Sequence, residues 1–265
     1  MAITTLDGYI AAAKQKIVLT KTSGMTTVAA NFGETLHLAG NPGAGTLAGS
    51  NTANGVVPTD ATPGFPLINA FGASATGYLT GVDFSSTVAC RMKLVDVLFK
   101  AGAYPYNTNT TLSSQPSYSS RVPGGTNFGG LELWVEAVTA FTGNLSIAVT
   151  YTNQDGTAAR TTGTVTTNAA PIMGRMIQLP LQARDCGIQK IESVVATVST
   201  VGTFNLLVVR PLWEGNIRLA NAGDIHDFMK TGMPQVFADS ALGLFIAADS
   251  ISTGIPSLLL EVANG

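Results

Sequence analysis

The chain has 265 residues, of which only 11% are charged, against about 25% in an average soluble domain. Hydrophobic residues reach 45%, so the missing charge is not the signature of a disordered chain. The net charge is −2 and no cluster of Lys or Arg occurs, which excludes a nucleic-acid-binding footprint. The apolar stretches are too short to span a bilayer, so we expect no membrane partner.

This shortage of charge bears on the outer surface of the protein. The 33 threonines alone outnumber the 14 basic and 16 acidic residues together, so Ser, Thr, Asn and Gly must cover most of the surface. A soluble monomer needs charge for solubility, whereas a subunit that buries its outside against other copies needs less. We interpret the composition as that of an obligate oligomer or lattice subunit. The alternative is a soluble polar sandwich, which also tolerates many Thr and Ser.

The first eight residues lack a basic region followed by an apolar one, so we expect no secretory signal and synthesis in the cytoplasm. Cys90 and Cys186 lie far apart in the sequence and have no metal-ligand spacing. Free thiols are therefore expected rather than a disulfide.

Three segments lack a strand pattern. Residues 7–17 contain three consecutive alanines and predict a short helix, which needs a docking surface because so short a helix is marginal alone. Residues 41–75 are rich in Gly, Pro, Ala, Thr and Asn and predict an extended loop or arm. A second long loop is expected over 103–130. Loops of this length are commonly functional or interfacial, so we expect both to reach neighbouring subunits.

Elsewhere, apolar and polar residues alternate as in strands. The residues around Asp155-Gly156 predict a hairpin between 145–151 and 158–167, because the glycine accepts a positive φ. One helical turn is expected at 224–230. Further strands are expected at 87–100, 131–141, 175–179, 188–198, 204–210, 242–247 and 258–262. The fold class predicted is all-β: an antiparallel, jelly-roll-like β-sandwich with an extended N-terminal arm and long Gly/Pro-rich loops. We divide it into an arm (1–75), a sandwich core (76–215) and a C-terminal segment (216–265) that completes the sandwich or reaches a neighbour.

No constellation of residues predicts catalysis, a cofactor or a metal. Glu132 and Glu136 share a strand face roughly 13 Å apart, farther than a glycosidase pair, and we expect two solvent-facing charges. Of the two histidines, His37 and His226, the second lies in Asp-Ile-His-Asp (224–227), which we interpret as a polar turn that caps a short helix. Residues 40–46 resemble a phosphate loop but lack its lysine, and we interpret their glycines as letting the backbone turn sharply or approach a neighbour.

The aromatic side chains supply candidates for contact. Tyr104, Tyr106 and Tyr118 lie in the second long loop and, with Trp134 and Trp213, would suit either subunit contact or glycan stacking. We place subunit contact first. The interface candidates are Tyr9, Pro42, Gly43, Tyr104, Tyr106, Tyr118 and Trp213.

Four stretches of the sequence resemble a group of tailed-bacteriophage virion structural proteins. They are residues 1–22 (MAITTLDGYIAAAKQKIVLTKT), the AGNPGAG segment, the hairpin VTYTNQDGTAARTTGTV and the run VVRPLWEGNIRLANAGD. The stretches are patterns of turns and strands and carry no catalytic residue. The resemblance implies a location in the virion and a β-sandwich body with terminal arms.

Three hypotheses follow. The first is a capsid decoration (cement) protein, whose partners are the major capsid protein and copies of itself in a trimer or another small ring. The second is a tail or fibre component that contacts host glycan through loop aromatics. The third, a carbohydrate-active enzyme, requires carboxylates that converge in a groove.

Overall fold

The computed structural model describes residues 3–47, 51–72, 75–167, 170–196 and 201–265. About 49% of the chain is strand and 6% helix, and the strands form antiparallel sheets in a curled, sandwich-like arrangement. The expected all-β sandwich is therefore confirmed. In the described ranges, no helix has the length and hydropathy needed to cross a bilayer.

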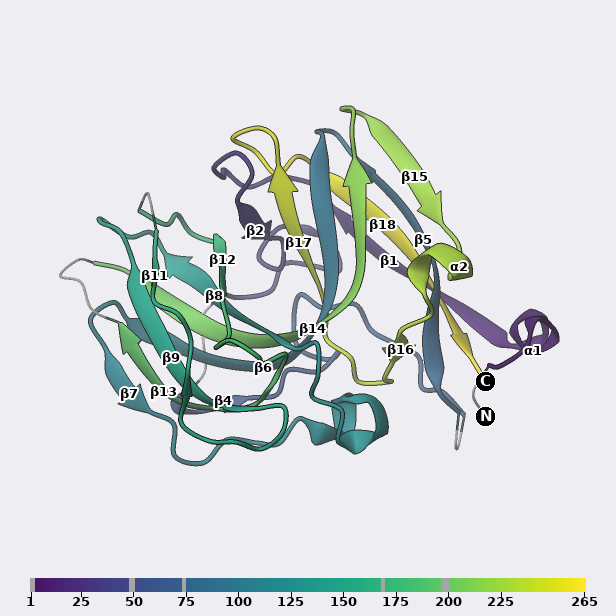
Figure 1. Ribbon diagram of the computed structural model, residues 1–265. Coiled ribbons are helices and arrows are strands. Elements are labelled where there is room, and N and C mark those ends of the chain that lie inside the picture. The colour runs from purple at the N-terminus through teal and green to yellow at the C-terminus, as the bar shows by residue number, and fades with distance from the viewer. Residues whose placement is uncertain (1–2, 48–50, 73–74, 168–169, 197–200) are drawn as a thin grey trace.

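Within the described ranges, the strands form three sheets (Figure 1). The six-stranded sheet has the order β15 (Ala222–His226), β5 (Gly77–Ser86), β18 (Pro256–Asn264), β1 (Ala13–Lys21) and β3 (Gly40–Asn41), with β16 (Gln235–Val236) beside β5. The seven-stranded sheet has the order β12 (Met176–Leu179), β8 (Glu132–Thr139), β14 (Thr203–Ile217), β6 (Cys90–Pro105), β17 (Leu242–Ala248) and β2 (Phe32–Glu34), with β4 (Asn51–Val56) beside β6. The five-stranded sheet has the order β10 (Arg160–Thr161), β9 (Ser146–Asn153), β13 (Ile188–Ala196) and β7 (Asn109–Thr111), with β11 (Val165–Thr166) beside β9.

Four short helical segments complete the described fold. They are α1 (Leu6–Ala11), α2 (Phe228–Thr231) and the 3₁₀ turns η1 (Ser119–Arg121) and η2 (Pro123–Gly125). The division into 1–75, 76–215 and 216–265 stays a prediction. Strands from the first and last of these ranges are hydrogen-bonded neighbours, since β1 pairs with β18 over eight residues.

The seven-stranded sheet serves two hydrophobic cores, because its strands β6 and β14 are long enough to run through both. One end of these strands packs with the six-stranded sheet, through residues such as Leu94 and Leu212. The other end packs with the five-stranded sheet, through residues such as Leu98 and Val208. In Figure 1 the two strands can be followed from one lobe to the other.

A buried charge cluster lies where the two cores meet. Asp96 stands between Leu94 and Leu98 on β6 and is paired directly with Arg210 of β14. Its carboxylate is fully buried and accepts hydrogen bonds from the guanidinium groups of Arg121 and Arg210, from the Ser240 hydroxyl at 2.7 Å and from the Ala241 N–H at 3.0 Å. The carboxylate thereby ties together both long strands, η1 and the turn before β17.

Arg121 shows why the predicted loop 103–130 is ordered against the body. Its side chain is fully buried and donates to the carbonyls of Pro58 and Val97 as well as to Asp96. The first residues of this range extend β6, and Asn109–Thr111 form β7. The aromatic side chains of this range pack into the core beneath the five-stranded sheet and do not project into solvent.

The predicted loop 41–75 also packs against the body over much of its described length. Phe65 joins a third core on the opposite face of the seven-stranded sheet, with Trp134 and Phe245. Ile68 belongs to the core against the six-stranded sheet, and Leu47 is also buried. Gly40 lets β3 lie close to β1, since a Cβ at this position would stand 2.1 Å from the Thr20 carbonyl oxygen. The close approach expected of these glycines is therefore made within the chain.

The helix predicted over 7–17 is wrong in its second half. It ends at Ala11, and Ala13–Lys21 form β1. Residues Ile17 and Leu19 alternate with exposed neighbours, and a full ladder to β18 outweighs the helix propensity of the alanines.

The remaining strand predictions are confirmed with shifted ends, and the last two residues of 188–198 lie outside the described ranges. Strands β5 and β15 were not expected.

The predicted hairpin is confirmed, with both β10 and β11 paired to β9. A carboxylate clamp at Asp185 holds the residues of this hairpin together. Asp185 accepts hydrogen bonds from the Tyr151 hydroxyl at 2.7 Å, from Asn153 at 2.9 Å and from Arg160 at 2.9 Å and 3.2 Å. The Arg160 guanidinium, with these other donors, holds the pKa of Asp185 at about 2.

We predict that Asp96→Ala lowers the free energy of unfolding by about 3–5 kcal/mol, because two buried guanidinium groups lose their carboxylate. Urea denaturation followed by tryptophan fluorescence measures this change. Asp249→Ala is the matched control, since Asp249 is exposed and lies outside the cluster, so its loss costs roughly 0.5 kcal/mol or less. Equal effects of the two substitutions would contradict the role given to Asp96.

The Asp185 clamp predicts a pH-dependent difference in stability. Because the folded-state pKa of about 2 lies below the ordinary value of 3.8, the carboxylate stabilises the fold above about pH 4, and this contribution is lost as the pH falls toward 2. Asp185→Asn should therefore lower the urea midpoint at pH 7, with the difference from wild type shrinking between pH 4 and pH 2. A difference that stays constant over this range would contradict the clamp.

Candidate interaction surface

The six-stranded sheet turns one face toward the core and the other toward solvent. On the solvent side, Val18 of β1 is paired with Leu259 of β18, Leu259 with Asp83 of β5, and Asp83 with Ile225 of β15. These four residues form one row across the sheet. We call this solvent side of β1, β18, β5 and β15 the outer face.

Several apolar side chains are exposed on and beside the outer face. Ile225 is 64% exposed, and Val18 and Leu259 are also exposed. In α2, which follows β15, Met229 is 78% exposed. Large apolar side chains in one row on one sheet face indicate a surface that another protein covers.

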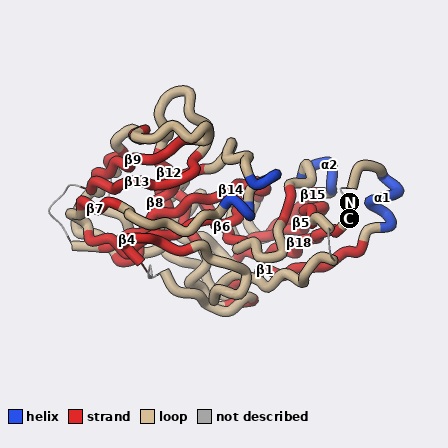
Figure 2. The backbone as a smooth tube through the Cα atoms, turned by 90° about the horizontal axis from the view of Figure 1, so that it is seen from below, coloured by secondary structure: helices blue, strands red, loops and turns tan. Residues whose placement is uncertain are grey.

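Helix α1 adds two more apolar side chains at the end of this sheet. Leu6 and Ile10 are 61% and 66% exposed, and the helix buries no residue. Figure 2 shows α1 at one extremity of the molecule. Tyr9 fastens it to the body: its hydroxyl donates to Glu261 at 3.0 Å, and its ring lies 4.9 Å from that of Phe228.

The charges of the outer face are unevenly distributed. Lys14 and Lys16 lie on β1, and Lys16 pairs with Glu261 of β18 at 2.7 Å. Toward the other edge, Asp83 is exposed, and Asp227 accepts hydrogen bonds from the Met229 and Lys230 N–H groups at the start of α2. A hollow of about 290 Å³, lined by Lys16, Asp227, Leu259 and their neighbours, lies between the two flanks.

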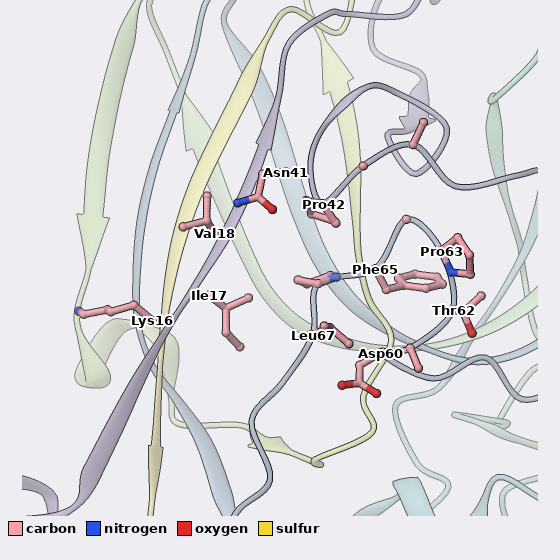
Figure 3. Close-up of a pocket in the computed structure, with 15 residues that line it drawn as sticks. Lys16, Ile17, Val18, Asn41, Pro42, Asp60, Thr62, Pro63, Phe65 and Leu67 are labelled. Atoms are coloured by element: carbon pink, nitrogen blue, oxygen red, sulfur yellow. The ribbon is translucent and has the colours of Figure 1, made fainter.

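A larger groove opens along the edge of β1 (Figure 3). Its volume is about 640 Å³, and it is lined by residues 16–18 of β1, 41–44 and 60–67. Lys21 holds its 42 loop by donating to the carbonyls of Leu38 and Pro42, and Asp60 shapes the other wall by accepting from the Ile68 N–H at 3.0 Å. Burial lowers the pKa of Lys21, against the opposing effect of Glu34. The groove meets the outer face at Lys16 and Val18.

The predicted interface residues divide into two groups. Gly43 is exposed, Tyr9 and Pro42 are half-buried, and Pro42 and Gly43 line the groove. Their role in subunit contact stays a prediction.

The other four interface candidates are buried within the chain. Tyr104, Tyr106 and Tyr118 are at most 2% exposed, and Trp213 is 5% exposed. The Tyr104 hydroxyl donates to the Thr52 carbonyl at 2.8 Å, and that of Tyr118 to Ile188 at 2.9 Å. These side chains are packed in the cores, so we do not include them in the interaction surface. The same burial removes the proposed platform for glycan stacking.

The expectation of two solvent-facing glutamates is wrong. Glu136 is 1% exposed, lies 3.0 Å from the Lys100 ammonium and accepts a hydrogen bond from Asn205. Glu132 is half-buried and bonded to Lys93 at 2.7 Å and to the Trp134 N–H at 2.8 Å. Phe32, Leu36 and Phe65 cover this face of β8, where each carboxylate is paired. Burial raises the pKa of Glu136, while Lys100 opposes the rise.

The histidines have structural partners. His226 accepts a hydrogen bond from the Trp213 N–H at 2.9 Å and packs against Phe84. Residues 224–226 belong to strand β15, so the helical turn expected at 224–230 begins only at Phe228, with Asp227 as its N-terminal cap. His37 lies 2.8 Å from Glu34. In the part of the chain that the structure describes, no three His, Cys, Asp or Glu residues gather as metal ligands. Both cysteines are free, Cys90 buried and Cys186 exposed.

Sequence reasoning missed Val18, Ile225 and Leu259. A signal was present for Leu259, because three consecutive leucines at 258–260 cannot all face one side of a strand. No strand was predicted over 18–21, so Val18 was not placed on a sheet face, and Ile225 was assigned to a polar turn.

Comparisons with known proteins were made for the whole chain. No family model matches it, and no curated protein is detectably similar. Among solved structures, the crystal structure of the infectious bursal disease virus VP2 subviral particle shares 10% identity over 96% of this chain and 80% of that chain, with a TM-score of 0.24. The Gx strain of the same virus gives 11% identity over 96% and 80%, with a TM-score of 0.16.

These neighbours are viral capsid structures, but their TM-scores are too low to carry an argument about this chain. They do not support an assignment to tailed bacteriophages, which rests on the sequence resemblance alone.

Proposed function

We propose that the chain is a non-enzymatic structural protein of a virus particle. The observation that carries the proposal is the outer face, where apolar side chains stand open on a chain with only 11% charged residues. A surface of this kind suits a subunit that other protein molecules cover. The resemblance of four stretches to virion structural proteins supports the choice of a virus particle.

Within that class, we propose a decoration protein on the head of a tailed bacteriophage. Its partners would be the major capsid protein and copies of itself in a trimer or another small ring. Phe65 and Arg121 pack parts of the 41–75 and 103–130 segments into the body, so the contacts expected of these segments would fall to other surfaces. Helix α1 and the groove at Pro42 and Gly43 supply surfaces for contact at either end of β1. The alternative of a glycan-binding tail component loses its main support with the burial of Tyr104 and Tyr106.

Deleting residues 1–11 tests the proposal, because α1 buries no residue and the sandwich should fold without it. Particles of the virus that encodes the chain are purified and the copies per particle counted by mass spectrometry and electron microscopy. We expect the wild-type chain on the particle surface in a fixed ratio to the shell protein, and at least a tenfold loss of occupancy after the deletion.

Leu219→Ser is the control, since Leu219 is 72% exposed and lies away from α1 and the groove. This variant should retain wild-type occupancy. Absence of the wild-type chain from particles would refute the virion role, and full occupancy after the deletion would refute the role of α1.

A further inference from the structure

We propose that the outer face packs against the outer face of a second copy, about a two-fold axis that runs parallel to the strands between β5 and β18. The inference rests on the proposed function and names one contact through which copies of the chain assemble. In this arrangement β1 of one copy lies over β15 of the other, and β18 lies over β5.

The pairing registers of the sheet define what meets across such an axis. Val18, Leu259, Asp83 and Ile225 occupy one row, and an axis parallel to the strands keeps each row opposite itself. Val18 therefore faces Ile225 of the second copy, and both are exposed apolar side chains in the single chain. The next row beyond Val18 is occupied by Thr20, Ser257, Ser85 and Gly223, whose small side chains let a second sheet approach to about 10 Å.

Charge selects this axis over its alternatives. Lys14 and Lys16 lie on β1, and Lys16 keeps a side chain that is 58% exposed. An axis perpendicular to the strands would lay β1 over β1, which carries no acidic residue to meet these lysines. The axis parallel to the strands instead places Lys16, which shares a row with Glu261 and Gly81, over the flank of the second copy that carries Asp227. Opposite charges then meet at both ends of the contact, as a two-fold interface requires.

The size of the face explains why the helices belong to the contact. Four strands about 4.8 Å apart, each presenting about seven residues at roughly 3.3 Å per residue, measure roughly 19 by 23 Å. A stable interface buries about 800 Å² on each partner, so the strands alone fall short. The exposed Leu6, Ile10 and Met229 of α1 and α2 lie at the ends of the same strands and extend the apolar area.

Cross-linking between two single-cysteine variants tests the geometry. Val18→Cys and Ile225→Cys are each made with Cys186→Ser, because Cys186 is the exposed native thiol and Cys90 is buried. A bis-maleimide with a reach of about 10 Å, the separation of packed sheets, is added to each variant and to an equimolar mixture. We expect covalent dimers in the mixture and at least tenfold fewer with either variant alone, since residues 18 of the two copies lie roughly 17 Å apart.

A matched pair of charge insertions tests the surface itself. Leu259→Asp opposes a second carboxylate to Asp83 of the other copy, which lies in the same row, and should raise the dissociation constant of the dimer at least tenfold, measured by sedimentation equilibrium. Val195→Asp is the control, because Val195 is similarly exposed, 42% against 37%, on the face of another sheet. It should leave the dissociation constant within twofold of wild type.

The outcomes separate this inference from the proposed function. No cross-link in the mixture, equal cross-linking of each variant alone, or equal effects of the two aspartate insertions would overturn the two-fold contact. If the wild-type chain still occupies particles in that case, the virion role stands and another surface joins the copies. Oligomers of odd number only would likewise overturn the contact.

Discussion

The arrangement of the two main cores depends on the buried carboxylate of Asp96. Asp96 lies on β6 between the two main cores, paired with Arg210 across the sheet, and its carboxylate also binds Arg121 and the turn before β17. A buried carboxylate is costly unless several donors satisfy it, so the strands and loops that carry those donors must be in place together. The two lobes therefore share one charge cluster as well as one sheet. If the loop that carries Arg121 left the body, the buried Asp96 carboxylate would lose one of its two guanidinium partners.

The fold class and many of its strands could be predicted because their signal is local. Alternation of apolar residues gave β8 and β9, and Asp155-Gly156 gave the hairpin with its correct partner. The errors occurred where distant contacts decide. Residues 13–17 were predicted as helix, but they form a strand because β18 pairs with them. Glu136 was predicted as a surface charge, but the third core covers its face of β8 and Lys100 pairs with it. Tyr104 and Tyr118 lie in a stretch rich in turn residues, and only the buried Arg121 shows why that stretch packs inward.

The candidate surface was the least predictable part of the molecule. Composition showed that the surface is poor in charged residues but could not show where exposed apolar side chains share a sheet face. That depends on which residues of β1, β15 and β18 fall in one row, and β15 and the start of β1 were not recognised as strands. The interface candidates chosen for being aromatic proved mostly buried, because aromatic side chains are the most effective filling for a core that two sheets must share. The residues that stand open are instead aliphatic, and a sequence shows them only once the strand register is known.

The central claim is that other copies of the chain cover a surface so poor in charge, and the mass of the purified protein in solution tests it most directly. Sedimentation of the full chain over a wide range of concentrations should show a defined oligomer of the 27.3 kDa subunit that persists on dilution to the low micromolar range. A single copy at every concentration, soluble and without affinity for itself, would contradict the account.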